Sequence, residues 1–148
     1  LKVTGKAVPK EDAQSAGIQK GSETVLLVDD EEMITKIVKE LLETLGYTVL
    51  LARSGTEAIE TYRACWETID IIILDMIMPG MGGSETFNRL KAINPDMKVI
   101  LSSGYSMNGQ VKEILDRGCN GFIQKPIRIA DLSQKLREIL DDRRRRGR

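Results

Sequence analysis

The sequence predicts an α/β fold in which a five-stranded parallel sheet is flanked by five helices. Apolar runs of strand length alternate five times with segments whose apolar residues recur at helical spacing. Aspartate, serine or lysine residues lie at the ends of the first, third, fourth and fifth apolar runs. Because the carboxyl ends of parallel strands meet at one edge of a sheet, the same pattern predicts a ligand site at that edge.

The strands are predicted from short apolar runs with many β-branched residues. The run IIIL before Asp75 has no polar interruption, which is typical of a strand buried on both faces. The other runs, such as TVLLV and KVIL, have the same length and character. The predicted strands lie at 24–29, 47–52, 70–75, 98–103 and 120–124.

The helices are predicted from apolar spacing and from residues that start or end a helix. Gly46 and Gly118 suit the left-handed conformation that ends a helix, and Asn94 precedes a proline. Ser54 and Glu57 form a capping box that opens the second helix. The helices are expected at 31–46, 54–65, from the turn at 79–83 to 93, at 108–117, and around 129–140.

Three regions differ in composition. Residues 1–22 lack periodicity, and we expect a linker or the tail of an upstream domain. Residues 23–142 form the predicted domain, and the basic tail 143–148 is expected to be disordered. Since the chain begins with Leu1 and has no secretory signal, we expect it to be an excerpt of a longer protein.

Charge and composition exclude several classes of function. The chain has 22 basic and 22 acidic residues, but residues 23–142 keep 13 basic against 20 acidic ones, a net charge of −7. Direct nucleic-acid binding is therefore not expected. No apolar run is long enough to cross a membrane, and Cys65 and Cys119 are expected to be reduced thiols of a cytoplasmic protein. The absence of histidine argues against a zinc site and against histidine-dependent catalysis.

The polar residues at the strand ends form a candidate site. Asp29 and Asp30 end the first predicted strand, and Asp75 ends the third. Three carboxylates repel one another, and a hard divalent cation such as Mg²⁺ relieves that repulsion. Ser103 and Lys125 end the fourth and fifth strands and suit a phosphoryl oxygen. Such a group can accept and hold a phosphoryl group as an aspartyl phosphate, whereas the competing interpretation is a structural ion-pair cluster.

Four motifs lie at these strand ends in order along the chain. They are LLVDDEE, ILDMIMPGMGG, ILSSGYS and GFIQKP. Together they resemble the receiver domain of bacterial two-component response regulators. This resemblance implies the strand order 2-1-3-4-5, a flavodoxin-like (βα)5 fold.

The resemblance also implies roles for single residues. Asp75 would be the phosphoacceptor, Lys125 would contact the phosphoryl group, and Ser103 and Phe122 would be the switch hydroxyl and switch aromatic. The Lys125–Pro126 bond is commonly cis in this family. The Mg²⁺ ligands would be Asp30, Asp75, the backbone carbonyl of Ile77, and Asp29 directly or through water.

Two positions, Gly82 and Phe122, depart from the pattern that is common in the family. Gly82 stands where many receivers have Asp, so we expect a more mobile loop at 79–83 but unchanged chemistry. Phe122 replaces a Tyr, and a core role for it is an equal alternative. Ile77 and Tyr105 occupy the positions that flank the phosphoryl group, and neither orients a water well, so we expect slow self-dephosphorylation.

The implied partner is a histidine kinase or phosphotransfer domain that donates the phosphoryl group. The fourth helix, fifth strand and fifth helix, 107–140, are expected to form the output surface, through which a homodimer could also form. The start of the chain resembles the junction between the ATPase domain and the receiver in hybrid sensor kinases. A phosphorylation-independent interaction module with the same fold is the alternative.

Two other classes of α/β protein fit this sequence less well. A haloacid-dehalogenase-like phosphatase needs a second Asp two residues after the nucleophile, where this chain has Ile77. A dinucleotide-binding domain needs a Gly-rich loop after the first strand, and the acidic sequence DDEE at that place would repel phosphate.

Overall fold

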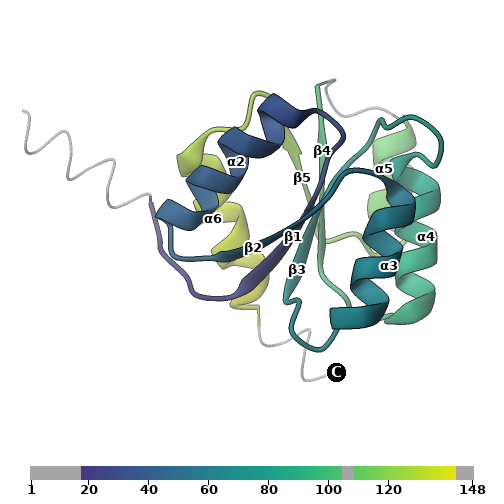
Figure 1. Ribbon diagram of the computed structural model, residues 1–148, viewed down its shortest axis with the longest axis horizontal. Helices are drawn as coiled ribbons and strands as arrows, with labels where there is room; N and C mark the ends of the chain where they lie inside the picture. Colours follow the sequence, from purple (N-terminus) through teal and green to yellow (C-terminus); the bar gives the residue numbers. More distant parts are fainter. Residues whose placement is uncertain (1–17, 105–108, 143–148) are drawn as a thin grey trace, which may run out of the picture.

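In the computed structural model, which describes residues 18–104 and 109–142, a parallel sheet lies between two layers of helices (Figure 1). The five strands run in the order β2-β1-β3-β4-β5, so the predicted fold class and strand order are confirmed. The strands are β1 (Thr24–Val28), β2 (Thr48–Ala52), β3 (Ile71–Asp75), β4 (Val99–Ser103) and β5 (Gly121–Gln124). The helices are α2 (Glu32–Thr44), α3 (Gly55–Cys65), α4 (Gly83–Ile93), α5 (Gly109–Asp116) and α6 (Ile129–Leu140).

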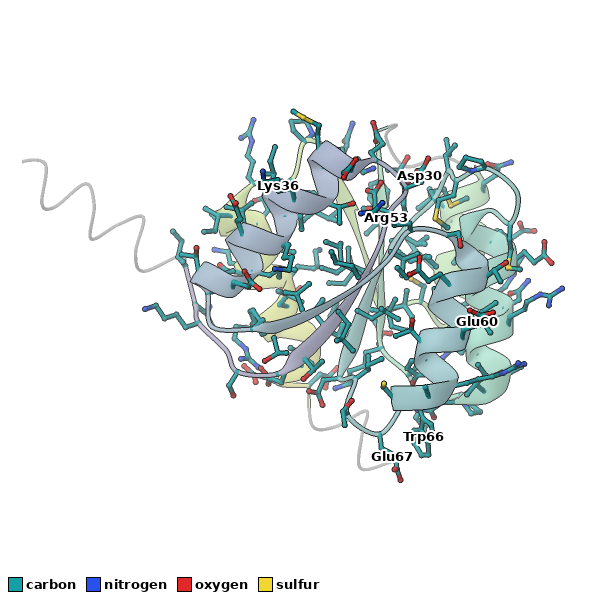
Figure 2. The ribbon with its side chains drawn as sticks, in the orientation of Figure 1. Asp30, Lys36, Arg53, Glu60, Trp66 and Glu67 are labelled. Atoms are coloured by element: carbon teal, nitrogen blue, oxygen red, sulfur yellow. The ribbon has the colours of Figure 1, made fainter. Side chains whose placement is uncertain are left out.

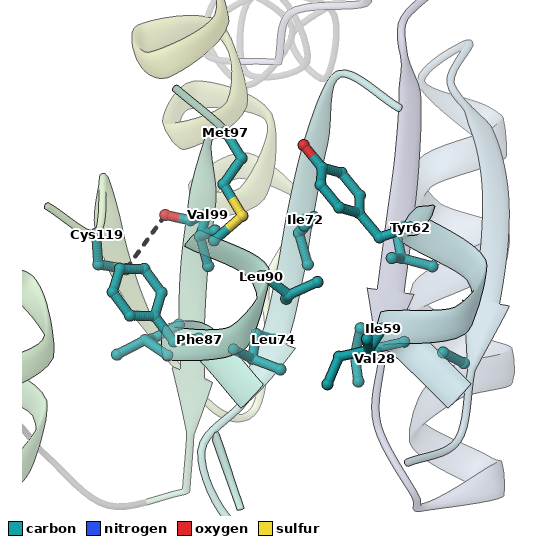
Figure 3. Close-up of a cluster of buried hydrophobic side chains, with 14 of the residues drawn as sticks. Val28, Ile59, Tyr62, Ile72, Leu74, Phe87, Leu90, Met97, Val99 and Cys119 are labelled. Atoms are coloured by element: carbon teal, nitrogen blue, oxygen red, sulfur yellow. Dashed lines mark hydrogen bonds between the residues drawn. The ribbon is translucent and has the colours of Figure 1, made fainter. Parts of the chain in front are cut away.

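The alternation of side chains along the strands divides the core into two clusters. Leu26 and Val28 of β1 face one side of the sheet, where they pack with α3, α4 and α5 (Figure 3). Val25 and Leu27 face the other side, where they pack with α2 and α6. All five residues of β3 are buried, which explains its uninterrupted apolar sequence.

The predicted turn residues adopt the expected backbone. Gly46 and Gly118 have φ angles of 104° and 106°, in the left-handed region that favours glycine. Ser54 caps α3, because its Oγ accepts a hydrogen bond of 3.1 Å from the Glu57 amide. The Glu57 carboxylate does not return to Ser54 and accepts instead from the Arg53 amide at 2.7 Å. The Glu57 carboxylate therefore binds the amide of the residue before the one that a capping box would use.

The ends of the described chain contact the domain closely. Residues 18–22, predicted to be part of a linker, lie against α6 and against the turn between α2 and β2. The predicted start of the fourth helix at Asn108 and the basic tail lie outside the described residues. No helix within 18–104 or 109–142 is both long and apolar enough to cross a membrane.

Candidate functional site

Three carboxylates meet at the carboxyl edge of the sheet, as the sequence predicts. Asp29 follows β1 directly, Asp30 is the next residue, and Asp75 is the last residue of β3. One oxygen from each carboxylate lies within 4.8 Å of the other two. Asp29 and Asp75 are only 2% and 4% exposed, whereas Asp30 is exposed to solvent (Figure 2).

The register of β1 and β3 brings these residues together. Val28 pairs with Leu74, so the positions that follow them, Asp29 and Asp75, are also neighbours. The Asp29 carboxylate accepts a hydrogen bond of 2.9 Å from the Glu31 amide. This bond turns the chain sharply into α2 and fixes the orientation of the Asp29 side chain.

Lys125 is held among the carboxylates. Its Nζ donates to Asp29 Oδ2 at 2.8 Å and to Asp75 Oδ1 at 3.2 Å, with Glu31 Oε1 at 3.5 Å. The Lys125 amide donates to the Ser103 carbonyl at 2.7 Å, which continues the pairing of β4 with β5. The Lys125–Pro126 peptide bond is cis.

The site carries more negative charge than Lys125 can balance. Burial, together with the nearby charge of Asp29, raises the pKa of Asp75 to about 6, although Lys125 and the Ile77 amide oppose this shift. Burial alone would lower the pKa of Lys125, but its hydrogen bond to Asp29 and the charge of Asp75 raise it. Lys125 therefore stays protonated, and the surplus charge lies on the carboxylates.

This donor set fits a hard divalent cation. Two buried carboxylates and one exposed carboxylate offer only oxygen ligands. Burial first, and the charge of Asp29 second, disfavour the ionised form of Asp75. A cation with oxygen ligands, such as Mg²⁺, usually takes one or two carboxylates and keeps water or phosphate oxygens as its other ligands. The open side of the cluster, at exposed Asp30, leaves room for such ligands.

The other predicted site residues differ in their burial. Ser103, at the end of β4, is buried and 3% exposed. Phe122 of β5 is partly buried and packs against the core on the α3–α4–α5 side. The Ile77 side chain is 59% exposed, beside Asp75 in sequence. Tyr105 lies outside the described residues, so its expected position over the site stays a prediction.

Gly83 is a positioning residue that the motif alone does not explain. A Cβ at this position would lie 2.7 Å from the Asp75 carbonyl oxygen and 2.8 Å from the Met76 Cα. The Gly83 amide donates to the Met76 carbonyl at 2.9 Å, so α4 begins directly against the end of β3. The position just after a glycine-rich turn was the only signal in the sequence, and it indicated a turn and not a close contact.

A separate cavity lies far from this cluster. It has a volume of about 650 Å³ and is lined by residues at the amino ends of the strands, including Glu23, Asp70 and Lys98. None of the three clustered aspartates lines it. The cavity and the carboxylate cluster therefore lie at different ends of the strands.

Comparisons with known proteins agree with this geometry. The model of the response regulator receiver domain family matches residues 25–137. The sensor kinase CckA of Brucella abortus is 35% identical over 121 residues, which cover 82% of this chain but 13% of that protein. The response regulator DivK of Brucella ovis is 29% identical over 123 residues, covering 82% of this chain and 98% of DivK.

Solved structures show the same likeness. A receiver domain protein of Clostridium thermocellum superposes with a TM-score of 0.78 at 30% identity, covering 82% of this chain and 97% of that one. A CheX–CheY–BeF3–Mg complex of Borrelia burgdorferi gives a TM-score of 0.76 at 29% identity, with coverages of 79% and 88%. By its fold, its site and these matches, the chain belongs to the response regulator receiver domain family of two-component signalling.

Proposed function

We propose that Asp75 accepts a phosphoryl group from a phosphohistidine donor, and that this modification changes the conformation of the domain. The observation that carries the proposal is the position of Asp75. It is a buried carboxylate at a strand end, between Asp29 and Lys125. With a pKa of about 6, it is largely ionised at neutral pH and can act as a nucleophile.

The transfer forms one bond and breaks another. A carboxylate oxygen of Asp75 attacks phosphorus in line with the leaving group, and the phosphorus–nitrogen bond of the phosphohistidine breaks. The electron pair of that bond stays on the imidazole, which then binds a proton from water. The Lys125 ammonium, 3.2 Å from Asp75, is placed to contact a phosphoryl oxygen and to balance its charge.

The proposed metal ligands are Asp30, Asp75, the Ile77 backbone carbonyl, and Asp29 directly or through water. A bound Mg²⁺ would supply positive charge against the phosphoryl oxygens and the carboxylates. The protein's own contribution is to hold Asp29 and Asp75 in place through the register of β1 and β3. The solved CheX–CheY complex contains BeF3 and Mg, which supports a site of this kind.

The switch is proposed to run through Ser103 and Phe122. Ser103 is the last residue of β4, the strand that pairs with β3, and its hydroxyl would donate to the phosphoryl group. Phe122 is only partly buried at present, so it can pack further inward when Ser103 moves. The output surface would then be α5, β5 and α6, which is also the proposed homodimer face.

Exposed apolar residues beside the site suit a docking phosphodonor. Met33 and Ile37, one turn apart on α2, are 75% and 51% exposed, and Ile77 is 59% exposed. α2 starts two residues after Asp30, so this apolar surface borders the carboxylates. A histidine kinase or phosphotransfer domain could pack a helix here and present its phosphohistidine to Asp75.

The domain is proposed to be one part of a longer protein. We propose a domain of residues 23–142, a preceding linker, a basic C-terminal tail and a cytoplasmic location. The chain spans 13% of the length of the sensor kinase CckA, and this relation supports an origin as the receiver of a hybrid kinase. No direct binding of nucleic acid is proposed for the domain, because its net charge is negative.

Acetyl phosphate in the presence of Mg²⁺ tests the proposed function. We expect one phosphoryl group per chain by intact mass and its mapping to Asp75 by peptide analysis. Asp75→Asn should abolish the mass shift, whereas the matched change Asp96→Asn, at an exposed aspartate, should leave it unchanged. Phosphate on Ser102 or Ser103, or undiminished labelling of Asp75→Asn, would contradict the proposal. Absence of labelling in the wild type would favour the interaction-module alternative.

A further inference from the structure

The segment 18–23 is bound to the domain at two places, and we name it the N-terminal strap. At its first anchor, the Gly21 amide donates to the Leu45 carbonyl at 2.9 Å, beside the turn that joins α2 to β2. At its second anchor, the Gln19 amide donates to Ser133 Oγ of α6 at 3.3 Å. Ile18 packs against the apolar cluster between α2, α6 and the sheet.

Arg137 of α6 forms most of the second anchor. Its guanidinium donates to the Lys20 carbonyl at 3.3 Å and forms two hydrogen bonds to Glu23, at 3.1 Å and 2.6 Å. The Arg137 and Glu23 side chains are 12% and 28% exposed, so this pair is partly shielded from solvent. A two-pronged pair of this kind fixes orientation as well as distance.

Gly21 fits a narrow space between the two anchors. A Cβ at this position would lie 2.5 Å from Arg137 Nη1 and 2.5 Å from Tyr47 Cε1. Gly46 is equally constrained, because its Cβ would meet the Gly21 carbonyl. A larger residue at position 21 would therefore require the strap, the Tyr47 ring or the Arg137 guanidinium to shift.

Two buried polar atoms beside the strap lack a hydrogen bond in the part of the chain that the structure describes. Among the residues that the structure describes, the buried Tyr47 hydroxyl and Arg137 Nε have no hydrogen-bond partner. Buried polar groups without partners are costly, so this contact is less favourable than its number of hydrogen bonds alone would indicate. A small displacement of α6 could therefore release the strap.

From this geometry we propose that the strap restrains α6, and that phosphorylation at the opposite edge of the sheet loosens it. α6 begins four residues after Lys125, which contacts Asp75. A helix is a rigid element, so a change at Lys125 that shifts α6 must strain one anchor of the strap. By the reciprocity of coupled equilibria, weakening the strap should also favour the modified state. The inference rests on the proposed function of Asp75.

Amide hydrogen exchange with and without beryllofluoride and Mg²⁺ tests the coupling. Fluorine NMR first measures how much beryllofluoride is bound, and Asp75→Asn checks that it binds at the proposed site. We expect the amides of residues 18–23, Gly21 above all, to exchange at least threefold faster in the bound state. Unchanged exchange at full occupancy would overturn the proposal while leaving the function of Asp75 intact. Absence of beryllofluoride binding to the wild type would overturn both.

The reverse effect is tested with strap variants. Gly21→Ala should displace the strap and tighten beryllofluoride binding about fivefold, at the low end of typical couplings. Glu23→Gln, which keeps the side-chain shape, should act in the same direction to a smaller extent. The matched control is Gly109→Ala, where a Cβ would meet no atom of the described residues within 4 Å. If both strap variants bind beryllofluoride as the wild type does, the strap is a static part of the fold.

Discussion

Two charged groups lie at opposite edges of the sheet and differ in balance. At the carboxyl edge, Lys125 faces the buried carboxylates Asp29 and Asp75. At the amino edge, just before β1, Arg137 faces Glu23, with exposed Asp141 as a further neighbour. The carboxyl-edge group has a surplus of buried negative charge. The amino-edge group is a partly buried pair of one cation and one anion.

The pKa values of Asp75 and Glu23 are shifted in opposite directions. Burial and the charge of Asp29 raise the pKa of Asp75 to about 6 from its ordinary value of 3.8. Burial alone would also raise the pKa of Glu23, but the hydrogen bond and charge of Arg137, together with backbone hydrogen bonds, outweigh it, and that pKa is lowered. The balanced pair therefore stabilises the fold at neutral pH, whereas the unbalanced group destabilises it and is available to a cation and a phosphoryl group.

Removing the cation at each edge should give the largest difference in the free energy of unfolding between the two charged groups. Lys125→Ala leaves Asp29 and Asp75 facing each other, and we expect the free energy of unfolding to fall by about 3 kcal/mol at pH 7 in EDTA. Mg²⁺ should restore part of that loss. The variant should still bind Mg²⁺ but should not change conformation on phosphorylation, because Lys125 contacts the phosphoryl group.

The matched change at the amino edge is Arg137→Ala. We expect a loss of about 1 to 2 kcal/mol that does not depend on Mg²⁺. Urea unfolding of both variants, in EDTA and in Mg²⁺, gives the four values needed. A Mg²⁺-independent loss for Lys125→Ala would remove the distinction between the two edges.

Neutralising the acceptor should stabilise the metal-free protein. Each pKa unit corresponds to about 1.4 kcal/mol, so Asp75→Asn should raise the free energy of unfolding by about 3 kcal/mol at pH 7 in EDTA. Because the folded pKa of Asp75 is raised, its favourable contribution is complete below pH 4 and is lost as pH rises from about 4 through 6. The difference between Asp75→Asn and wild type should therefore grow over that range and then level off. A constant difference from pH 4 to 8 would exclude the raised pKa.

The sheet and the carboxyl edge could be predicted from the sequence because their signals are local. Apolar runs of four or five residues give the strands, and parallel strands must place Asp29, Asp75 and Lys125 at one edge. The positive φ angles at Gly46 and Gly118 follow from their places after helical patterns.

The amino edge could not be predicted in the same way. Glu23 and Arg137 lie 114 residues apart, and neither belongs to a local motif. Residues 18–22 have the polar, glycine-containing composition of a linker, yet Gly21 fits a space formed by Tyr47 and Arg137. Contacts between distant residues of ordinary type leave no pattern in a single sequence.

The exposed isoleucines Ile77 and Ile37 should differ in their effect on the rate at which phosphate is lost from Asp75. Ile77 lies beside the acceptor, and its apolar side chain cannot orient the water that hydrolyses an acyl phosphate. Ile77→Asn should speed loss of phosphate about tenfold, which is about 1.4 kcal/mol of barrier. The matched change Ile37→Asn, on α2, should leave the decay unchanged. Decay is followed after removal of acetyl phosphate at constant Mg²⁺, and equal rates for Ile77→Asn and wild type would reject the shielding role of Ile77.

The smallest expected effect is at the amino edge. Glu23→Gln should lower the free energy of unfolding by about 1 kcal/mol at pH 7, because one charged hydrogen-bond acceptor is lost. Since the folded pKa of Glu23 lies below its ordinary value of 4.5, this contribution is present above that value and is lost as pH falls through the folded pKa. Its pH dependence is thus opposite in sign to that of Asp75. Urea unfolding between pH 3 and 7 should show the two slopes, and a larger loss at pH 3 than at pH 7 would contradict the ion pair.

The surplus of negative charge at the carboxyl edge is tested most directly by titration with Mg²⁺. Isothermal titration calorimetry of the wild type should show one Mg²⁺ per chain, with a dissociation constant in the submillimolar to millimolar range, on the order expected of a site with few carboxylates and several waters. The double variant Asp30→Ala, Asp75→Ala should lose this binding, whereas Glu23→Gln should keep it. Undiminished Mg²⁺ binding by the double variant would show that the clustered aspartates at the carboxyl edge do not form the metal site.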